Sequence, residues 1–237
     1  MIKLDWDSSF FDLSISSSFH EVITEDILNQ SKNKMNEQLI DLCYLQSSNP
    51  ISDALLDSYP IEHSSQKNRF QKQVYTLSEH QNTHIKSIPT SSPITENIYN
   101  IAKQSGHHSR FKLDTKLPKG TFEKLYDEWI LQSIRRTLAD EVYVYVLERA
   151  VLGLITLKKK SDRVVIGLLG VDESTRGKKI GQSLIKQAEN YTIQCGLNIL
   201  DVSTQGSNLP AIRFYEKMRF VHSDITYIYH LWRNPQQ

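Results

Sequence analysis

The chain has 237 residues, of which 39% are hydrophobic and 23% charged, and its net charge is +1. This composition is typical of a soluble folded protein with one large domain or two small ones. A net charge so near zero argues against general binding to nucleic acid or anionic membranes, and no apolar run reaches the roughly 20 residues that a membrane-spanning helix requires.

The cysteines and the N-terminal sequence indicate the cellular compartment in which the protein is expected. Cys43 and Cys195 lie far apart in the sequence, so they form neither a CxxC motif nor a zinc-binding spacing. The N-terminal MIKLDWDSSFF lacks the basic and then apolar pattern of a secretion signal. We therefore expect a cytoplasmic protein with no bound metal.

The first part of the chain predicts a small mixed α/β domain. Residues 36–48 are typical of a short strand or helix, and residues 69–77 alternate as a strand does. Residues 78–100 are polar and contain prolines, which favours a linker. We therefore divide the chain into an N-terminal α/β domain, residues 1–95, and a second domain, residues 96–237.

The second domain begins with an amphipathic helix over residues 121–136, for which Thr121 is the expected N-cap. The later segments predict strands over 142–147, 151–157, 163–171, 197–204 and 225–232, and helices over 182–194 and 208–218. The connection from the third strand through a helix to the fourth predicts a right-handed parallel crossover, whereas the hairpins are antiparallel. The fold class is therefore α/β (α+β), with a mixed, mainly antiparallel sheet flanked by helices.

A charged loop that contains glycines follows the strand ending near Val171. Its sequence, VDESTRGKKIGQSLI, places Arg176, Lys178 and Lys179 at a helix N-terminus, where backbone N–H groups and the helix dipole favour an anion. Guanidinium and ammonium groups suit phosphate oxygens. The loop is neither a P-loop nor a dinucleotide-binding fingerprint, and the alternative interpretation is an ordinary basic surface loop.

This loop resembles the acetyl-CoA-binding motif of the GCN5-related N-acetyltransferase (GNAT) superfamily, Q/R-x-x-G-x-G/A. Arg176 stands at the first position of the motif and Gly181 at the last, whereas Lys179 replaces the usual middle glycine. The later segment NLPAIRFY, which ends at Tyr215, and the aromatic Phe220 also resemble features of that superfamily. The resemblance runs from the first hairpin to the last strand and implies the GNAT sheet.

The resemblance implies that acetyl-CoA is the cosubstrate and that the loop and its neighbours bind it. The implied contacts come from Leu169, Gly170, Val171, Arg176, Gly177, Lys178, Lys179, Ile180, Gly181, Gln182, Asn208 and Phe214. Tyr215 is implied as the general acid that protonates the departing thiolate. The alternative for Tyr215 is packing in the core, and the alternative for Asn208 is a helix N-cap.

Other segments resemble the bacterial dTDP-fucosamine N-acetyltransferases, which act on dTDP-4-amino-4,6-dideoxygalactose in surface-polysaccharide synthesis. They are LDWDSSFFDLSIS, HSRFKLDTKLPKGTFEKLYDEWI and the terminal YHLWR. The resemblance implies an N-terminal domain on the substrate side and suggests a homodimer. Arg110 is then a candidate for pairing with the diphosphate of the substrate. Phe111, Trp6 and Phe11 are candidates for stacking on the base or the sugar, with core packing as the alternative.

The expected function is direct transfer of acetyl from acetyl-CoA to the amine of a nucleotide-linked amino sugar, namely a dTDP-4-amino-4,6-dideoxy-hexose. No acyl-enzyme is expected, because neither cysteine has an evident base partner and no GxSxG motif occurs. The alternatives are an acetyltransferase for another amine, such as a peptide N-terminus or a small molecule, and an acetyl-CoA-binding module without turnover. The base that deprotonates the amine stays open among His107, His108, His222 and His230.

Overall fold

The structure of the protein is a computed structural model that describes residues 1–77 and 82–233. The first part of the chain forms β1 (Ile2–Lys3), α1 (Asp5–Phe11), β2 (Ile15–His20), α2 (Glu25–Glu37), β3 (Leu42–Ser47), α3 (Asp53–Ser58), β4 (Ile61–Gln73) and β5 (Ile85–Ser87). The remainder forms α4 (Glu96–Ser105), α5 (Arg110–Leu113), α6 (Thr121–Ile134), β6 (Glu141–Leu147), β7 (Ala150–Lys159), β8 (Val164–Val171), α7 (Ile180–Gln194), β9 (Ile199–Gln205), α8 (Leu209–Lys217) and β10 (Val221–Trp232).

The described strands form one ten-stranded sheet in the order β1-β2-β3-β10-β4-β9-β8-β7-β6-β5. Two pairs are parallel, β2 with β3 and β8 with β9, and the remaining pairs are antiparallel. The predicted mixed, mainly antiparallel sheet flanked by helices is therefore confirmed, including the parallel crossover through α7.

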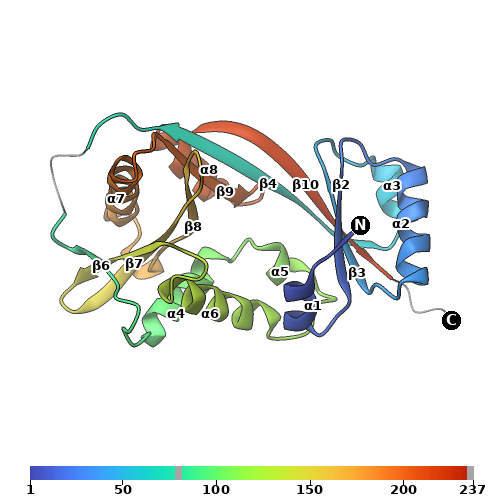
Figure 1. The fold of residues 1–237 in the computed structure, drawn as a ribbon, viewed down its shortest axis with the longest axis horizontal. Coiled ribbons are helices and arrows are strands. Elements are labelled where there is room, and N and C mark those ends of the chain that lie inside the picture. Colours follow the sequence, from blue (N-terminus) through green and yellow to red (C-terminus); the bar gives the residue numbers. More distant parts are fainter. Residues whose placement is uncertain (78–81, 234–237) are drawn as a thin grey trace.

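Two long strands, β4 and β10, join the two ends of the molecule (Figure 1). One half of β10 pairs with β3, and β4 pairs with β10 along its length and with β9 through its second half. Figure 1 shows β1–β3 with α2 and α3 at one end, and α7 and α8 with the β6–β9 strands at the other. The sheet therefore runs across residue 95, and the division of the chain into two domains there stays a prediction.

Alternating side chains on β3 and β10 divide the core at the N-terminal end. Leu42 and Tyr44 face a cluster with α1, α4 and α6, whereas Cys43 and Leu45 face a cluster with α2. Successive residues of a strand point to opposite faces of the sheet, and both faces here are covered by helices. A third cluster packs α7 and α8 against β7, β8 and β9.

Several local predictions need correction. The segment 36–48 contains the end of α2 and all of β3, and β4 covers Ile61–Gln73 rather than residues 69–77. The expected N-cap of α6, Thr121, is instead its first helical residue, because Gly120 takes the N-cap position with a φ of 80°. Of the predicted linker, residues 78–81 lie outside the described residues, and the remainder contains β5 and the start of α4.

No helix in the described part of the chain is both long and apolar enough to cross a membrane. Among the described residues, no group of three or more His, Cys, Asp or Glu side chains is arranged to hold a metal ion.

Candidate active site

Strands β8 and β9 separate at the point where the candidate site begins. Their parallel pairing covers only Val164 to Ile166 on β8, and ends where Ile166 meets Val202. Beyond this pair, β8 continues to Val171 and β9 to Gln205. The backbone groups on the facing edges of these two strand ends are therefore available to a ligand rather than to each other, because strand pairing otherwise consumes them.

A cavity of about 530 Å³ lies at the end of β8 and the start of α7, and we call it the β8–α7 cavity. Twelve of the thirteen residues predicted for cosubstrate binding and catalysis line it: Leu169, Gly170, Val171, Arg176, Gly177, Lys179, Ile180, Gly181, Gln182, Asn208, Phe214 and Tyr215. The thirteenth, Lys178, is exposed on the same loop and does not line the cavity. Three sequence motifs that lie up to about 45 residues apart thus converge on one space.

The loop before α7 contains two residues with left-handed backbone conformations. Lys179, where the superfamily motif has a glycine, is the N-cap of α7 with φ 62° and ψ 11°. This left-handed conformation costs a non-glycine residue about 1–2 kcal/mol. Gly177 also has a positive φ, of 83°. The lysine therefore adopts the glycine-like conformation at this position, and its side chain adds a positive charge to the cavity wall.

The first turn of α7 directs backbone donors at the cavity. The N–H groups of Ile180, Gly181 and Gln182 precede the first helical hydrogen bond at this end, which runs from the Ser183 N–H to the Lys179 carbonyl at 3.1 Å. No acidic residue lies in this turn. Together with Arg176 and Lys179, these donors make the cavity mouth suited to a phosphate group.

Gly170 allows helix α4 to approach the end of β8. A Cβ atom at Gly170 would lie 2.7 Å from the carbonyl oxygen of Ile101 and 2.7 Å from its Cγ2 atom. The space beside Gly170 is therefore filled by α4. The close approach brings the C-terminal end of α4, with Gln104 and Ser105, to the wall of the cavity.

Tyr215 lies at the inner wall of the cavity, within an aromatic cluster. Its ring packs against Phe70, Phe214 and Phe220, with centroids 6.1, 5.5 and 5.6 Å away, and the residue is 6% exposed. Burial raises the pKa of the Tyr215 phenol above its ordinary value, so the hydroxyl is protonated at neutral pH. The position of Tyr215 is compatible with both interpretations, core packing and a role as general acid. Its ring is part of the core, and the residue also borders the cavity.

Asn208 caps helix α8. Its Oδ1 accepts a hydrogen bond from the Ala211 N–H at 3.3 Å, which confirms the alternative interpretation of this residue as an N-cap. It also lines the β8–α7 cavity, so the two roles considered for it are compatible.

The four residues predicted for substrate binding lie together, but they line neither this cavity nor the one described next. The rings of Phe11 and Phe111 stack at 5.7 Å, and Trp6 stacks on Phe10 at 4.8 Å. The Arg110 guanidinium lies over Phe111 at 4.3 Å and over Tyr44 at 4.2 Å. Their contact with a substrate stays a prediction.

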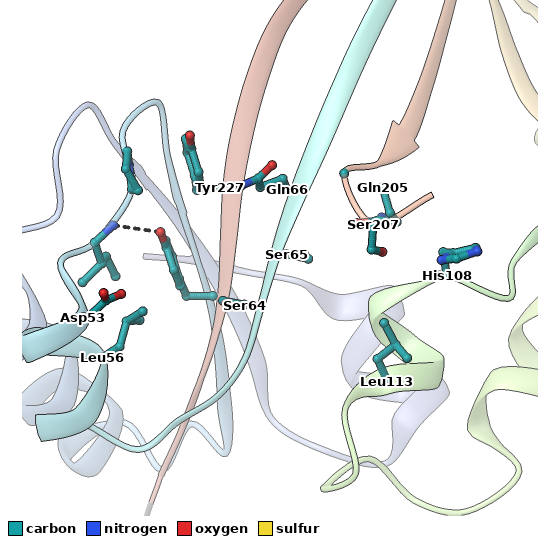
Figure 2. Close-up of a pocket in the computed structure, with 14 residues that line it drawn as sticks. Asp53, Leu56, Ser64, Ser65, Gln66, His108, Leu113, Gln205, Ser207 and Tyr227 are labelled. Carbon is teal, nitrogen blue, oxygen red and sulfur yellow. Dashed lines mark hydrogen bonds between the residues drawn. The ribbon is translucent and has the colours of Figure 1, made fainter. Parts of the chain in front are cut away.

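A second cavity, of about 510 Å³, lies between β4, β10 and the loop that leads into α8, and we call it the β4–β10 cavity. Figure 2 shows Ser64, Ser65 and Gln66 along β4, with Tyr227 on β10 and with Gln205, Ser207 and His108 across from them. The remaining lining residues are Pro50, Ile51, Asp53, Leu56, Leu113, Gly206 and Tyr229. The hydroxyl of Tyr229 accepts from the Ile51 N–H at 2.8 Å.

The two cavities meet at His108 and at the loop after β9. His108 lines both cavities, and Ser207, in the β4–β10 cavity, is followed directly by Asn208, in the β8–α7 cavity. The second cavity was missed in the sequence because its walls come from segments far apart in the chain. The sequence did single out the adjacent residues His107 and His108 as candidate bases, but it did not indicate which cavity either of them lines.

The four histidines considered as bases have different surroundings in the structure. His230 is fully buried, with Nδ1 at Asp114 and Nε2 at Arg110, and His222 Nε2 lies 3.0 Å from Asn68 Oδ1. His107 lines only the β8–α7 cavity, and desolvation lowers its pKa, with Lys112 and Arg176 acting in the same direction. His108 is the one of the four that borders both cavities.

Comparisons with known proteins identify the family and the fold of the chain. The model of the acetyltransferase (GNAT) family matches residues 101–220. The chain is 28% identical over 145 residues to the spore coat polysaccharide biosynthesis protein SpsD of Bacillus subtilis (strain 168), which covers 58% of this chain and 47% of that protein. The chain thus spans about half the length of this curated relative.

Solved structures share the fold. A functionally unknown conserved protein from Staphylococcus epidermidis superposes with a TM-score of 0.61 at 12% identity, over 91% of this chain and 84% of its own. A GCN5-related N-acetyltransferase from Sphaerobacter thermophilus superposes with a TM-score of 0.58 at 14% identity, over 89% of this chain and 68% of its own. Identities this low show the fold alone. The family model, in contrast, matches the sequence from within α4 to just beyond α8, about half of the chain, and the chain belongs to the acetyltransferase (GNAT) family.

Proposed function

We propose that the protein transfers the acetyl group of acetyl-CoA directly to the amine of a nucleotide-linked amino sugar, a dTDP-4-amino-4,6-dideoxy-hexose. The observation that carries the catalytic part is the convergence of the loop before α7, the end of β8 and Tyr215 on one cavity. The sugar is supported by the resemblance of the N-terminal segments and by a relative named for polysaccharide biosynthesis. The product would then serve surface-polysaccharide synthesis.

The cavity fits acetyl-CoA at its charged end. The N–H groups of Ile180, Gly181 and Gln182 and the side chains of Arg176 and Lys179 would bind the diphosphate. The free edge of β8, at Leu169 to Val171, would pair with the amide groups of the pantetheine arm. This arrangement directs the thioester toward the gap between β8 and β9.

The transfer itself needs a polarised carbonyl and a stabilised leaving group. A backbone N–H at the end of β8 would donate to the carbonyl oxygen as negative charge develops there. The Tyr215 phenol, protonated because burial raises its pKa, would donate to the sulfur as the C–S bond breaks. The amine must arrive uncharged, since only its lone pair can attack the carbonyl carbon.

An acetylation panel tests this function. The full chain is given acetyl-CoA with dTDP-4-amino, dTDP-3-amino and UDP-amino sugars, and with a peptide N-terminal amine and a free polyamine as controls. Thiol release with a nucleotide amino sugar supports the proposal, and acetylation of the control amines alone contradicts the substrate. Binding of acetyl-CoA without turnover on any amine would favour the module without activity.

A further inference from the structure

The β4–β10 cavity adjoins the cosubstrate site without belonging to it, and no motif assigned it a role. We propose that it holds the sugar ring of the acceptor and presents the amine at His108, which accepts the proton that the nitrogen loses on acetylation. This inference rests on the proposed function and adds the place and the chemistry of acceptor binding.

The position of the cavity supports the inference. Strands β8 and β9 separate after the Ile166–Val202 pair, so a gap lies between the end of β8, which lines the cosubstrate cavity, and the end of β9, which lines the second. A thioester that enters along β8 therefore meets a nucleophile that enters from the side of β9. The two cavities share His108, so an acceptor and a cosubstrate would meet beside that side chain.

The chemistry of the walls suits a neutral, hydroxyl-bearing ring. Hydroxyl and amide side chains dominate the polar lining, from Ser64, Ser65, Gln66, Gln205, Ser207 and Tyr227. Apolar faces come from Ile51, Leu56 and Leu113. A sugar ring has both kinds of surface, because its hydroxyl groups lie around the edge and its C–H groups lie on the faces.

Two polar atoms of this lining have unmet hydrogen-bonding capacity. Ser65 Oγ and Gln205 Oε1 are buried, and within the described part of the chain neither has a hydrogen-bond partner. Buried polar atoms in folded proteins are normally paired, and each exception calls for an explanation. The residues Ser65 and Gln205 both line the same cavity, so a side-chain rotation at each would bring its oxygen into contact with one bound hydroxylated ligand.

The turn that follows Gln205, the last residue of β9, is held tightly against β4. The Gly206 N–H donates to the Gln66 carbonyl at 2.7 Å, and a Cβ atom at Gly206 would lie 2.7 Å from Gln66 Oε1. The absence of a side chain at Gly206 therefore lets the loop after β9 and the side chain of Gln66 form one continuous wall. This close contact holds the turn between Gln205 and Ser207 at the wall of the cavity.

The charges of the lining favour a position for the sugar inside the cavity and for the nucleotide outside it. No Lys or Arg is among the described residues that line this cavity, and Asp53 is the one carboxylate there. A diphosphate has no cationic partner inside such a space, whereas a neutral sugar and its amine are compatible with it. Several lining residues, including Asp53, Ser64 and Ser207, are exposed, so the nucleotide would extend outward through this open side.

The reaction balances with the groups present. The uncharged amine attacks the carbonyl carbon, the C–N bond forms and the C–S bond breaks. His108 takes one proton from the nitrogen, and Tyr215 gives one to the thiolate. His108 then releases its proton to solvent and Tyr215 is reprotonated from solvent, so that the amine and acetyl-CoA yield the acetamide and the CoA thiol.

The test uses Gln205→Leu, which removes an amide whose oxygen has no hydrogen-bond partner among the described residues, and His108→Gln, which keeps a polar group but cannot take up a proton. Gln73→Leu, on the exposed end of β4, and His20→Gln, on β2, are the matched controls. With dTDP-4-amino-4,6-dideoxygalactose, Gln205→Leu should raise the acceptor KM about tenfold and leave the acetyl-CoA KM within about twofold. His108→Gln should lower kcat about 100-fold with both KM values little changed.

The controls should behave as the parent protein, and circular dichroism should show all four variants folded. An unchanged acceptor KM in Gln205→Leu, or an unchanged kcat in His108→Gln, overturns the inference while the proposed function stands. If the parent protein acetylates no amino sugar, the proposed function fails, and the cavity is then judged by calorimetry with the same dTDP sugar and the CoA-saturated chain. Binding that Gln205→Leu weakens supports the cavity, and equal or absent binding in both proteins overturns it.

Discussion

Arg110 Nη1 donates a hydrogen bond to His230 Nε2 at 3.0 Å, although the two residues are 120 positions apart in the chain. Because a guanidinium can only donate, Nε2 must accept, and the proton of His230 lies on Nδ1, which donates to Asp114. Asp114 also accepts from Trp232 Nε1 at 3.1 Å. This buried network connects α5 to the end of β10 and thereby attaches the helical layer to the sheet.

The first prediction concerns the stability that this network provides. Asp114→Ala should lower the free energy of unfolding by about 3 kcal/mol, because it leaves the Trp232 and His230 donors buried without their acceptor. The exposed Asp57→Ala on α3 should change it by less than about 0.5 kcal/mol. Urea unfolding of both variants provides the measurement, and equal losses would contradict the role of the network.

The same carboxylate predicts how stability depends on pH. Burial acts to raise the pKa of Asp114, but hydrogen bonds from His230 and the Lys116 N–H outweigh it and hold the pKa below its ordinary value. A depressed pKa contributes stability above the unfolded pKa of about 3.9, and this contribution disappears as the pH falls through the folded pKa. The stability difference between the parent protein and Asp114→Ala should therefore be complete at pH 7 and shrink below about pH 4. A difference that is constant from pH 7 to pH 3 would refute this origin.

The second prediction separates the two roles of Tyr215. Tyr215→Phe keeps the ring contacts with Phe70, Phe214 and Phe220 but removes the phenolic proton. We expect kcat to fall about 100-fold, with acetyl-CoA affinity within about threefold of the parent value. Steady-state rates and calorimetry provide the two readouts, and Tyr75→Phe, at a residue that is 77% exposed, is the matched control. Parent-like turnover in Tyr215→Phe would show that the residue is only part of the core.

The third prediction concerns charge at the start of α7. Arg176 lines the β8–α7 cavity and Lys178 does not, so Arg176→Ala should weaken acetyl-CoA binding about tenfold and Lys178→Ala less. The loss should diminish at high salt, since exposed charges are screened. Lys186→Ala, exposed on α7, should leave the affinity unchanged. Calorimetric affinities that are equal in Arg176→Ala and Lys186→Ala would contradict phosphate binding at this turn.

The fourth prediction tests the backbone conformation at Lys179. Lys179→Val should destabilise the protein by about 1–2 kcal/mol, because a β-branched residue is poorly accommodated at a φ of 62°. Lys179→Gly should cost nothing measurable and should retain acetyl-CoA binding. Lys186→Val, a similar exchange inside the helix, should cost less than about 0.7 kcal/mol. Thermal unfolding of the three variants distinguishes them, and equal losses for the two valine variants would argue against strain at the N-cap.

The sequence by itself determined the elements whose signals are local. The order of strands and helices after residue 120, the loop that precedes α7 and the cap at Asn208 all depend on contacts between residues close together in the chain. Most residues predicted to bind the cosubstrate also lie in that region, because the motif spans consecutive positions, and the structure places them around one cavity.

Only the tertiary structure decided which strands β4 pairs with and which cavity walls the N-terminal part of the chain forms. The alternation of β4 predicts a strand, but its position between β9 and β10 depends on partners more than 120 residues away. The β4–β10 cavity, the shared position of His108 and the pairing of Arg110 with His230 follow from that placement. Local periodicity carries no information about which distant strand a given strand will pair with, because that choice is made by packing over the whole sheet.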